Sequence, residues 1–383
     1  MPVITETSDL AAACAIMAKQ PFVAVDTEFM RETTYWPKLC LLQAAAPGVD
    51  AVIDPLAPGL DMSPFLALLD DNRITKVFHA ARQDLEIFFH LNDRKVPAPL
   101  FDTQIAAMAG GHGDSIAYDA LVSAVLNKRI DKSSRFTDWS RRPLSEDQIA
   151  YARADVTHLR DLYPLLVNDL KKAGRLDWVA DEIESLRDPS LYDTEPDSAW
   201  KRLKVRRSGR DYLLTLQTAA AWRERTAQSR NVPRGRVLKD DALYEIAEQR
   251  PRNAAAFDRL RAVPKGFGAS RYGIELTGLI EAMLGDPKAQ PQNYERPAPL
   301  PSGAGPTVEL LKVLLRHLAE ANNVAPRLIA SAAEIEAIAA SDKADVPALQ
   351  GWRREVFGER ALALKHGKIA LSLHKGHVTI VES

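Results

Sequence analysis

Cysteine is scarce in this sequence, and its positive and negative charges almost cancel. Cys14 and Cys40 are the 2 cysteines among 383 residues, too few for a disulfide framework or a zinc site built from thiolates. The chain has 50 lysines and arginines against 51 aspartates and glutamates, so its net charge is −1. Because no global positive field attracts a polyanion, a nucleic-acid site must come from local clustering of basic residues.

Long apolar runs are also missing, and the first residues do not have the pattern of a leader segment. No uninterrupted apolar stretch approaches the roughly 20 residues that a membrane span needs. The first six residues lack the basic and apolar regions of a signal peptide. Hydrophobic residues make up 46% and charged residues 26% of the chain, as in ordinary globular proteins. We therefore expect a cytoplasmic protein of two or three domains, without a membrane partner and with a monomer favoured.

The spacing of apolar residues predicts an α/β domain over residues 1–195. Three successive strands, expected as a β-meander, are followed by a further strand and several helices. The expected strands lie at 22–29, 39–45, 51–54 and 74–78, and the expected helices at 62–69, 80–90, 101–109, 118–126 and 145–165. The last helix has the clearest start, because Ser145 and Gln148 have the spacing of a capping box.

After about residue 200 the pattern changes to helices without clear strands. We expect a small helical bundle over 205–286, a proline-rich, uncollapsed linker over 287–306, and a second helical module over 307–383 that ends in a hairpin. The expected helices lie at 213–227, 240–249, 254–263, 272–284, 308–321, 326–332, 333–340 and 347–357, and the hairpin strands at 369–373 and 378–381.

Asp26 and Glu28 end the first predicted strand and are the first candidate site residues. Side chains alternate along a strand, so these two carboxylates point to the same face. They repel each other unless a cation lies between them, and hard divalent ions prefer oxygen ligands. An isolated pair of this kind is more often two solvated acids, so its meaning depends on whether further carboxylates join it.

Two later segments supply further acids. Asp84 lies near the start of the helix expected at 80–90, where the helix dipole alone would favour an acid. Tyr151 and Asp155 are four residues apart and share one face of the helix expected at 145–165, where a surface tyrosine–aspartate pair is the alternative. Together these residues predict a site for two divalent ions, because converging acids without cations are costly.

These motifs resemble those of the DEDD-type 3′→5′ exonucleases of the tyrosine subclass, and specifically the bacterial ribonuclease D family. The likeness rests on residues 25–29, 77–84, 138–144 and 151–156, while 222–224 and 231–235 are similar to the HRDC module. The resemblance implies an α/β, ribonuclease H-like exonuclease domain, in which helices flank a mixed sheet. Two small all-α HRDC-like bundles are expected to follow, the second of them, at 307–383, degenerate.

The resemblance also implies a role for each acid. Asp26, Glu28 and Asp155 are expected to hold the ion that carries the attacking water. A second ion would be bridged by Asp26 and supported by Asp84, both ions being Mg²⁺ or Mn²⁺. Tyr151 is expected to orient the water and not to accept its proton, because a phenol with a pKa near ~10 is a poor base. The implied reaction releases 5′-nucleoside monophosphates from the 3′ end of RNA.

Basic and aromatic residues near the acids are candidates for contacting RNA. Arg31 and Tyr35 follow the first motif and are suited to gripping a phosphate and stacking a base, and His79 lies beside the second motif. A basic run precedes the third motif, although such runs are usually solvated faces. The run consists of Lys128, Arg129, Lys132, Arg135, Arg141 and Arg142, and the last four are the candidates for contacting RNA. Further basic residues lie at 201–210 and in the HRDC-like segment.

The expected partner is RNA, in particular tRNA precursors and other small structured RNAs, as the resemblance implies. One alternative keeps the chemistry but uses DNA, since no reader of the 2′-hydroxyl is recognisable in the sequence. The other alternative is a catalytically silent RNA-binding protein. The complete set of acids argues against it, because concentrated negative charge weakens phosphate binding.

Overall fold

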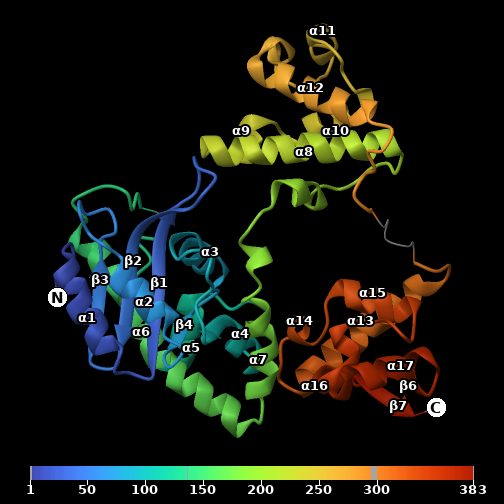
Figure 1. Ribbon diagram of the computed structural model, residues 1–383. Helices are drawn as coiled ribbons and strands as arrows, with labels where there is room; N and C mark the ends of the chain where they lie inside the picture. The colour runs from blue at the N-terminus through green and yellow to red at the C-terminus, as the bar shows by residue number, and fades with distance from the viewer. Residues whose placement is uncertain (1, 136, 295–299, 383) are drawn as a thin grey trace. The chain divides into compact units, whose positions relative to one another are not determined.

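The computed structural model describes residues 2–135, 137–294 and 300–382. Internal contacts divide the chain into two compact units. The first unit comprises Met1–Glu28, Leu41–Asp188 and Ala298–Ser383, and the second comprises Phe29–Cys40 and Pro189–Pro297. Figure 1 shows most of the sheet in blue, the helices of the second unit in yellow-green to orange and the C-terminal segment in orange to red. Among the described residues, no helix is long and apolar enough to cross a membrane.

A mixed sheet lies at the centre of the α/β domain, as the sequence predicts. Its described strands follow the order β3-β2-β1-β4-β5. They are β1 (Phe22–Met30), β2 (Lys38–Ala46), β3 (Val49–Ile53), β4 (Thr75–Phe78) and β5 (Leu100–Asp102). β2 and β3 pair antiparallel, whereas β4 pairs in parallel with both β1 and β5. Nearly all of β2 is buried, which is typical of a strand that is covered on both faces.

Seven described helices accompany this sheet: α1 (Thr7–Met17), α2 (Ser63–Asp70), α3 (Arg82–Leu91), α4 (Thr103–Ala109), α5 (Tyr118–Leu126), α6 (Glu146–Lys172) and α7 (Leu176–Ser185). The predicted capping box between Ser145 and Gln148 is confirmed at the start of α6. The helix continues past the predicted end at residue 165, because buried Leu166 and Leu170 extend its apolar face into the next turns. Helices α1 and α7 have no counterpart among the predicted elements.

The helix predicted at 101–109 is wrong at its first two residues, which form strand β5. Phe101 and Asp102 pair with β4, and the helix begins only at Thr103. Asp102 caps α4 by accepting the amide of Gln104 at 2.8 Å. The same carboxylate accepts the amides of Ala80 and Ala81 at 3.0 and 2.8 Å. It therefore holds the turn between β4 and α3, where Ala80 has a positive φ of 57°.

The second unit packs its helices around Trp222. They are α8 (Arg210–Arg230), α9 (Arg234–Val237), α10 (Asp240–Gln249), α11 (Ala254–Phe257) and α12 (Arg271–Gly285). The prediction of a helix through residue 263 is wrong because the chain folds back after Phe257. There the carboxylate of Asp258 accepts the amide of Gly266 at 2.8 Å.

The prediction of an uncollapsed linker over 287–306 is wrong for Gln292 and Tyr294, which pack against the second unit. Gln292 and Gln217 of α8 exchange two hydrogen bonds, from the Gln292 amide at 2.8 Å and to the Gln292 carbonyl at 3.0 Å. Tyr294 packs against the core of the second unit. The amide and the carbonyl of Gln292 therefore have hydrogen-bond partners within the protein. In a solvated chain these groups would bond to water. Residues 295–299 of the predicted linker lie outside the described residues.

The C-terminal segment is helical and ends in the predicted hairpin. Its elements are α13 (Ala304–Ala321), α14 (Pro326–Ile329), α15 (Ala332–Ala340), α16 (Gly351–Arg353), α17 (Glu359–Lys365), β6 (Ile369–His374) and β7 (His377–Glu382). The single helix predicted at 347–357 is wrong: a 3-10 turn precedes α16 and a π-helical turn follows it, and Gly351 between them has a positive φ of 48°. The helix predicted at 326–332 stops at Ile329, because Ser331 caps α15.

Candidate active site

Three carboxylates meet where β1 passes α6. Asp26 and Glu28 come from the strand and Asp155 from the helix, and one oxygen of each lies within 4.8 Å of the others. Strand alternation places the two β1 acids on one face, as the sequence predicts. Asp155 is buried, and the other two carboxylates are half-buried. The residues are 127 or more positions apart across the two elements, so only the fold brings them together.

Asp84 lies next to this cluster rather than within it. Its side chain is buried on α3, and its carboxylate accepts a hydrogen bond from the hydroxyl of Thr27. Thr27 is the residue between the two β1 acids. The charge of Asp26 raises the pKa of Asp84, in addition to the larger effect of burial. The four predicted acids are therefore arranged as a group of three with Asp84 alongside.

The electrostatics of the cluster favour a bound cation. Burial raises the pKa of Asp26 to about 6, and the backbone amide of Thr27 partly opposes this shift. Burial and then the neighbouring carboxylates raise the pKa of Glu28 to about 9 and that of Asp155 to about 8, while Arg135 lowers both. Such shifts mean that the three charges are costly together. A buried, all-oxygen donor set of this kind fits a hard divalent ion such as Mg²⁺ or Mn²⁺.

Tyr151 lies one helical turn before Asp155 on α6. Its hydroxyl and the carboxylate of Asp155 form a hydrogen bond, which lowers the pKa of that carboxylate. Burial, and then the charge of Asp155, raises the pKa of Tyr151 above its usual value. The phenol is therefore protonated at neutral pH and acts as a hydrogen-bond donor. Its ring packs on buried Trp139, with the ring centroids 6.0 Å apart.

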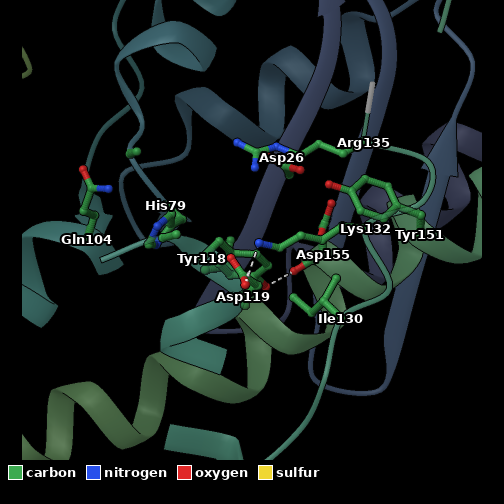
Figure 2. A pocket seen from close by; sticks show the side chains of 13 residues that line it. Asp26, His79, Gln104, Tyr118, Asp119, Ile130, Lys132, Arg135, Tyr151 and Asp155 are labelled. Carbon is green, nitrogen blue, oxygen red and sulfur yellow. Dashed lines mark hydrogen bonds and ion pairs between the residues drawn. The ribbon is translucent and has the colours of Figure 1, made fainter. Parts of the chain in front are cut away.

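A cavity of about 300 Å³ opens beside the acids (Figure 2). Tyr118 on its wall donates a hydrogen bond to the main-chain carbonyl of Asp155 and packs against His79, 5.1 Å between centroids. Burial lowers the pKa of His79, so its imidazole is neutral near pH 7 and supplies no positive charge to a phosphate. Besides Asp26, Asp155 and Tyr151, the other polar side chains on the wall are Gln104, Asp119, Lys132 and Arg135.

Three of the predicted RNA-contacting residues, His79, Lys132 and Arg135, line the cavity. Lys132 pairs with Asp119 at 2.6 Å, so an incoming phosphate competes with this carboxylate. Arg141 is exposed and is not part of the cavity lining. Arg31 is half-buried and belongs to the second unit.

The remaining two residues predicted to contact RNA, Tyr35 and Arg142, are bonded inside the protein. The ring of Tyr35 is buried, and its hydroxyl bonds to Glu224 within the second unit, so it offers no face for a base. Arg142 makes two 2.6 Å hydrogen bonds to the carboxylate of Asp54, so its charge is satisfied inside the protein. Several arginines of the second unit are likewise paired with acids, namely Arg206, Arg207, Arg225 and Arg250.

Tyr118, Asp119 and Gln104 line the cavity although no motif in the sequence marks them. Tyr118 and Asp119 are the first two residues of α5, and Gln104 is the second residue of α4. These helix starts reach the acids through the packing of α4 and α5 against α6. Such a contact can be recognised in a sequence only if the two contacting residues lie at a fixed spacing along the chain. These residues and the acids have no such spacing.

Comparison with known proteins identifies the family. Residues 1–171 match a family model described as a 3′-5′ exonuclease, and residues 215–280 match the HRDC domain. The chain is similar to ribonuclease D of Nitrobacter hamburgensis, with 53% identity over 383 residues and complete coverage of both chains. It is 49% identical over 375 residues to ribonuclease D of Gluconacetobacter diazotrophicus, covering 97% of this chain and 94% of that one.

A solved structure agrees with these relatives. The crystal structure of Escherichia coli RNase D, an exoribonuclease involved in structured RNA processing, has a TM-score of 0.82 to this chain at 30% identity. The match covers 95% of this chain and 98% of that one. With both the sequence and the fold shared over nearly the full length, this chain belongs to the ribonuclease D family of 3′→5′ exoribonucleases.

Proposed function

We propose that the chain trims RNA from its 3′ end by two-metal hydrolysis and releases 5′-nucleoside monophosphates. The observation that carries this proposal is the cluster of Asp26, Glu28 and Asp155 beside a cavity of about 300 Å³. Pockets that hold small organic molecules begin at about this volume, so the cavity suits one terminal nucleotide.

The acids divide into two sets of ligands in this proposal. Asp26, Glu28 and Asp155 hold one Mg²⁺ or Mn²⁺ ion, since their oxygens already converge. Asp26 and Asp84 serve a second ion, Asp84 either directly or through a water. When bound, the two ions activate a water molecule and stabilise the leaving 3′ oxygen. Binding also removes the repulsion that raises the pKa of Glu28.

Tyr151 orients the attacking water by hydrogen bonding. Its raised pKa keeps the proton on the phenol, so it positions the water and does not deprotonate it. Arg135 lines the cavity and acts electrostatically on Glu28 and Asp155. It is suited to meet the scissile phosphate. Lys132 binds the neighbouring phosphate, which replaces the Asp119 carboxylate as the partner of its ammonium group.

The proposed substrates are tRNA precursors and other small structured RNAs. The E. coli relative acts in structured RNA processing, which supports structured RNA as the class. The HRDC domain at 215–280, and residues 307–383 as a second, degenerate HRDC-like module, are proposed to hold the folded part of the RNA. A monomer in the cytoplasm stays our prediction for its state and location.

A digestion assay tests the proposal. Matched 5′-labelled RNA and DNA oligonucleotides with free or blocked 3′ ends are incubated with Mg²⁺ or EDTA, using the unmodified chain and Asp155→Ala. We expect Mg²⁺-dependent shortening of RNA from a free 3′ end only, and no shortening by the variant. Decay in EDTA, or full activity of Asp155→Ala, contradicts the two-metal proposal. Equal digestion of DNA contradicts the preference for RNA.

A further inference from the structure

One wall of the active-site cavity is a segment without regular structure. Between α5 and α6, the described residues 128–135 and 137–145 form neither helix nor strand. This segment carries Lys132 and Arg135 into the cavity lining, and it places Trp139 against the ring of Tyr151. A segment with few backbone hydrogen bonds of its own needs another anchor to hold these side chains in place.

Arg142 anchors the segment through four hydrogen bonds of its guanidinium group. Its Nε and Nη2 each lie 2.6 Å from one carboxylate oxygen of Asp54, at the end of β3. Its Nη1 donates to the main-chain carbonyls of Trp139 and Arg141, both at 2.8 Å. The planar guanidinium fork matches a carboxylate in this bidentate geometry, and a lysine does not.

Asp54 is itself held to the sheet. Its carboxylate also accepts the amide of Leu56 at 2.9 Å, and its own amide donates to the carbonyl of Ile4 at 2.9 Å. The Asp54 side chain is 9% exposed and that of Arg142 is 27% exposed. A partly buried pair of this kind is less screened by solvent than a surface pair. Both members of the pair therefore have further hydrogen bonds to the backbone around them.

The Asp54–Arg142 pair is connected to Tyr151 through Trp139. Arg142 holds the carbonyl of Trp139, and the Trp139 side chain is only 3% exposed. The indole packs on the phenol ring from the side of the segment, while the Tyr151 hydroxyl bonds to Asp155. A shift of the segment therefore moves the surface on which Tyr151 rests.

We propose that the Asp54–Arg142 pair is a positioning device that fixes Trp139 and thereby sets the Tyr151 ring for catalysis. This inference rests on the proposed role of Tyr151. Arg142 contacts no reacting atom in it and acts through Trp139. The competing role, a direct contact between Arg142 and an RNA phosphate, requires the arginine to leave four hydrogen bonds inside the protein.

The chain offers a matched control. Asp50 on β3 and Arg153 on α6 form a second ion pair at 2.9 Å, with side chains 25% and 26% exposed. This pair connects β3 directly to α6, so it does not pass through the segment that carries Trp139. Asp50→Asn therefore reports what a lost ion pair at this strand costs in general.

The experiment measures kcat and KM on a 3′-extended RNA for Arg142→Lys, Asp54→Asn, Tyr151→Phe and Asp50→Asn. Arg142→Lys keeps the charge but loses the fork. We expect kcat to fall about 10- to 100-fold for Arg142→Lys and Asp54→Asn, since a small misplacement of a catalytic group costs this much. KM, and RNA affinity measured in EDTA, should not change, and Asp50→Asn should retain kcat.

A double-mutant cycle separates positioning from other effects. In the Tyr151→Phe background, Arg142→Lys should cause almost no further loss, because two residues acting through one contact are not additive. Fully additive losses overturn the inference, as does a rise in KM that steepens with salt, which marks a phosphate contact. An equal loss of kcat in Asp50→Asn overturns it as well.

The same set distinguishes failure of the inference from failure of the proposed function. If Tyr151→Phe retains full kcat, the proposed role of Tyr151 is wrong and the inference falls with it. If Tyr151→Phe loses kcat and Arg142→Lys does not, only the inference is wrong. Should Asp54→Asn fail to fold, Arg142→Lys and Trp139→Phe, whose folding is checked by circular dichroism, still decide the outcome.

Discussion

The hydroxyl of Tyr35 donates a hydrogen bond to the carboxylate of Glu224, although 189 positions separate the two residues in the chain. Arg234 donates to the same carboxylate, from Nε to Oε2 at 2.6 Å. The side-chain oxygen of Asn231 accepts the amides of Tyr35 and Trp36, each at 3.0 Å. The loop that follows β1 is thus held by residues of the HRDC domain, and it belongs to the same compact unit as that domain.

Removing Glu224 should destabilise the second unit strongly. Its side chain is fully buried, so Glu224→Ala leaves Arg234 without its carboxylate partner. Breaking such a buried pair costs about 3–5 kcal/mol. Urea unfolding followed by tryptophan fluorescence measures the change. The control is Glu248→Ala, which breaks the exposed pair with Arg207 and should cost less than about 1 kcal/mol. Equal losses in the two variants would contradict the expected role of Glu224.

Tyr35→Phe should weaken stability without weakening RNA binding. The substitution removes the hydroxyl that bonds to Glu224 but keeps the buried ring, so about 1 kcal/mol of stability should be lost. Because the ring is buried, the affinity for a short single-stranded RNA should not change. Fluorescence anisotropy with a labelled oligonucleotide checks the affinity. Weaker binding by a Tyr35→Ala variant that still folds would instead restore the stacking role expected from the sequence.

The metal-free protein should lose stability as pH rises. Burial raises the folded-state pKa of Asp26 to about 6, of Asp155 to about 8 and of Glu28 to about 9, whereas unfolded carboxyls titrate near ~4. The folded state therefore binds more protons between these values, so its stability is greatest below pH ~4 with respect to these groups and falls up to pH ~9. Thermal melts in EDTA across this range measure the effect.

Neutralising one acid should reverse that loss. At pH 8 in EDTA, Glu28→Gln should melt at a higher temperature than the unmodified chain, because it removes a charge from the repelling cluster. Adding Mg²⁺ should raise the melting temperature of the unmodified chain more than that of the variant. Glu184→Gln, on an exposed side chain, is the control. If the control gains as much stability as Glu28→Gln, the repulsion is not the cause.

Thr27 should affect metal affinity through Asp84. Its hydroxyl donates to the Asp84 carboxylate, and losing a partner that orients a ligand typically costs 10- to 100-fold, so we expect a shift of about this size. Thr27→Val should raise the Mg²⁺ concentration needed for half-maximal RNA cleavage. Thr27→Ser keeps a hydroxyl at the same position and should behave like the unmodified chain. An unchanged Mg²⁺ requirement in Thr27→Val would show that Asp84 needs no such support.

Local patterns in the sequence are sufficient to predict part of this protein. Strand alternation puts Asp26 and Glu28 on one face, helical spacing puts Tyr151 beside Asp155, and the capping box places the start of α6. Each of these features depends on residues a few positions apart, whose geometry the backbone sets by itself. The family motifs that include these residues are therefore recognisable in the amino-acid sequence alone.

The partners of the basic and aromatic residues became visible in the tertiary structure and could not be read from the sequence. In the sequence, Arg142 is one of a basic run and Tyr35 is a residue in a polar turn, both suited to RNA. Their partners, Asp54 and Glu224, lie 88 and 189 positions away, where no periodicity links them. Which elements pack together determines whether a charge or a phenol contacts solvent, a phosphate or a buried acid. Packing between residues so far apart in the chain cannot be recognised from the local sequence around either residue.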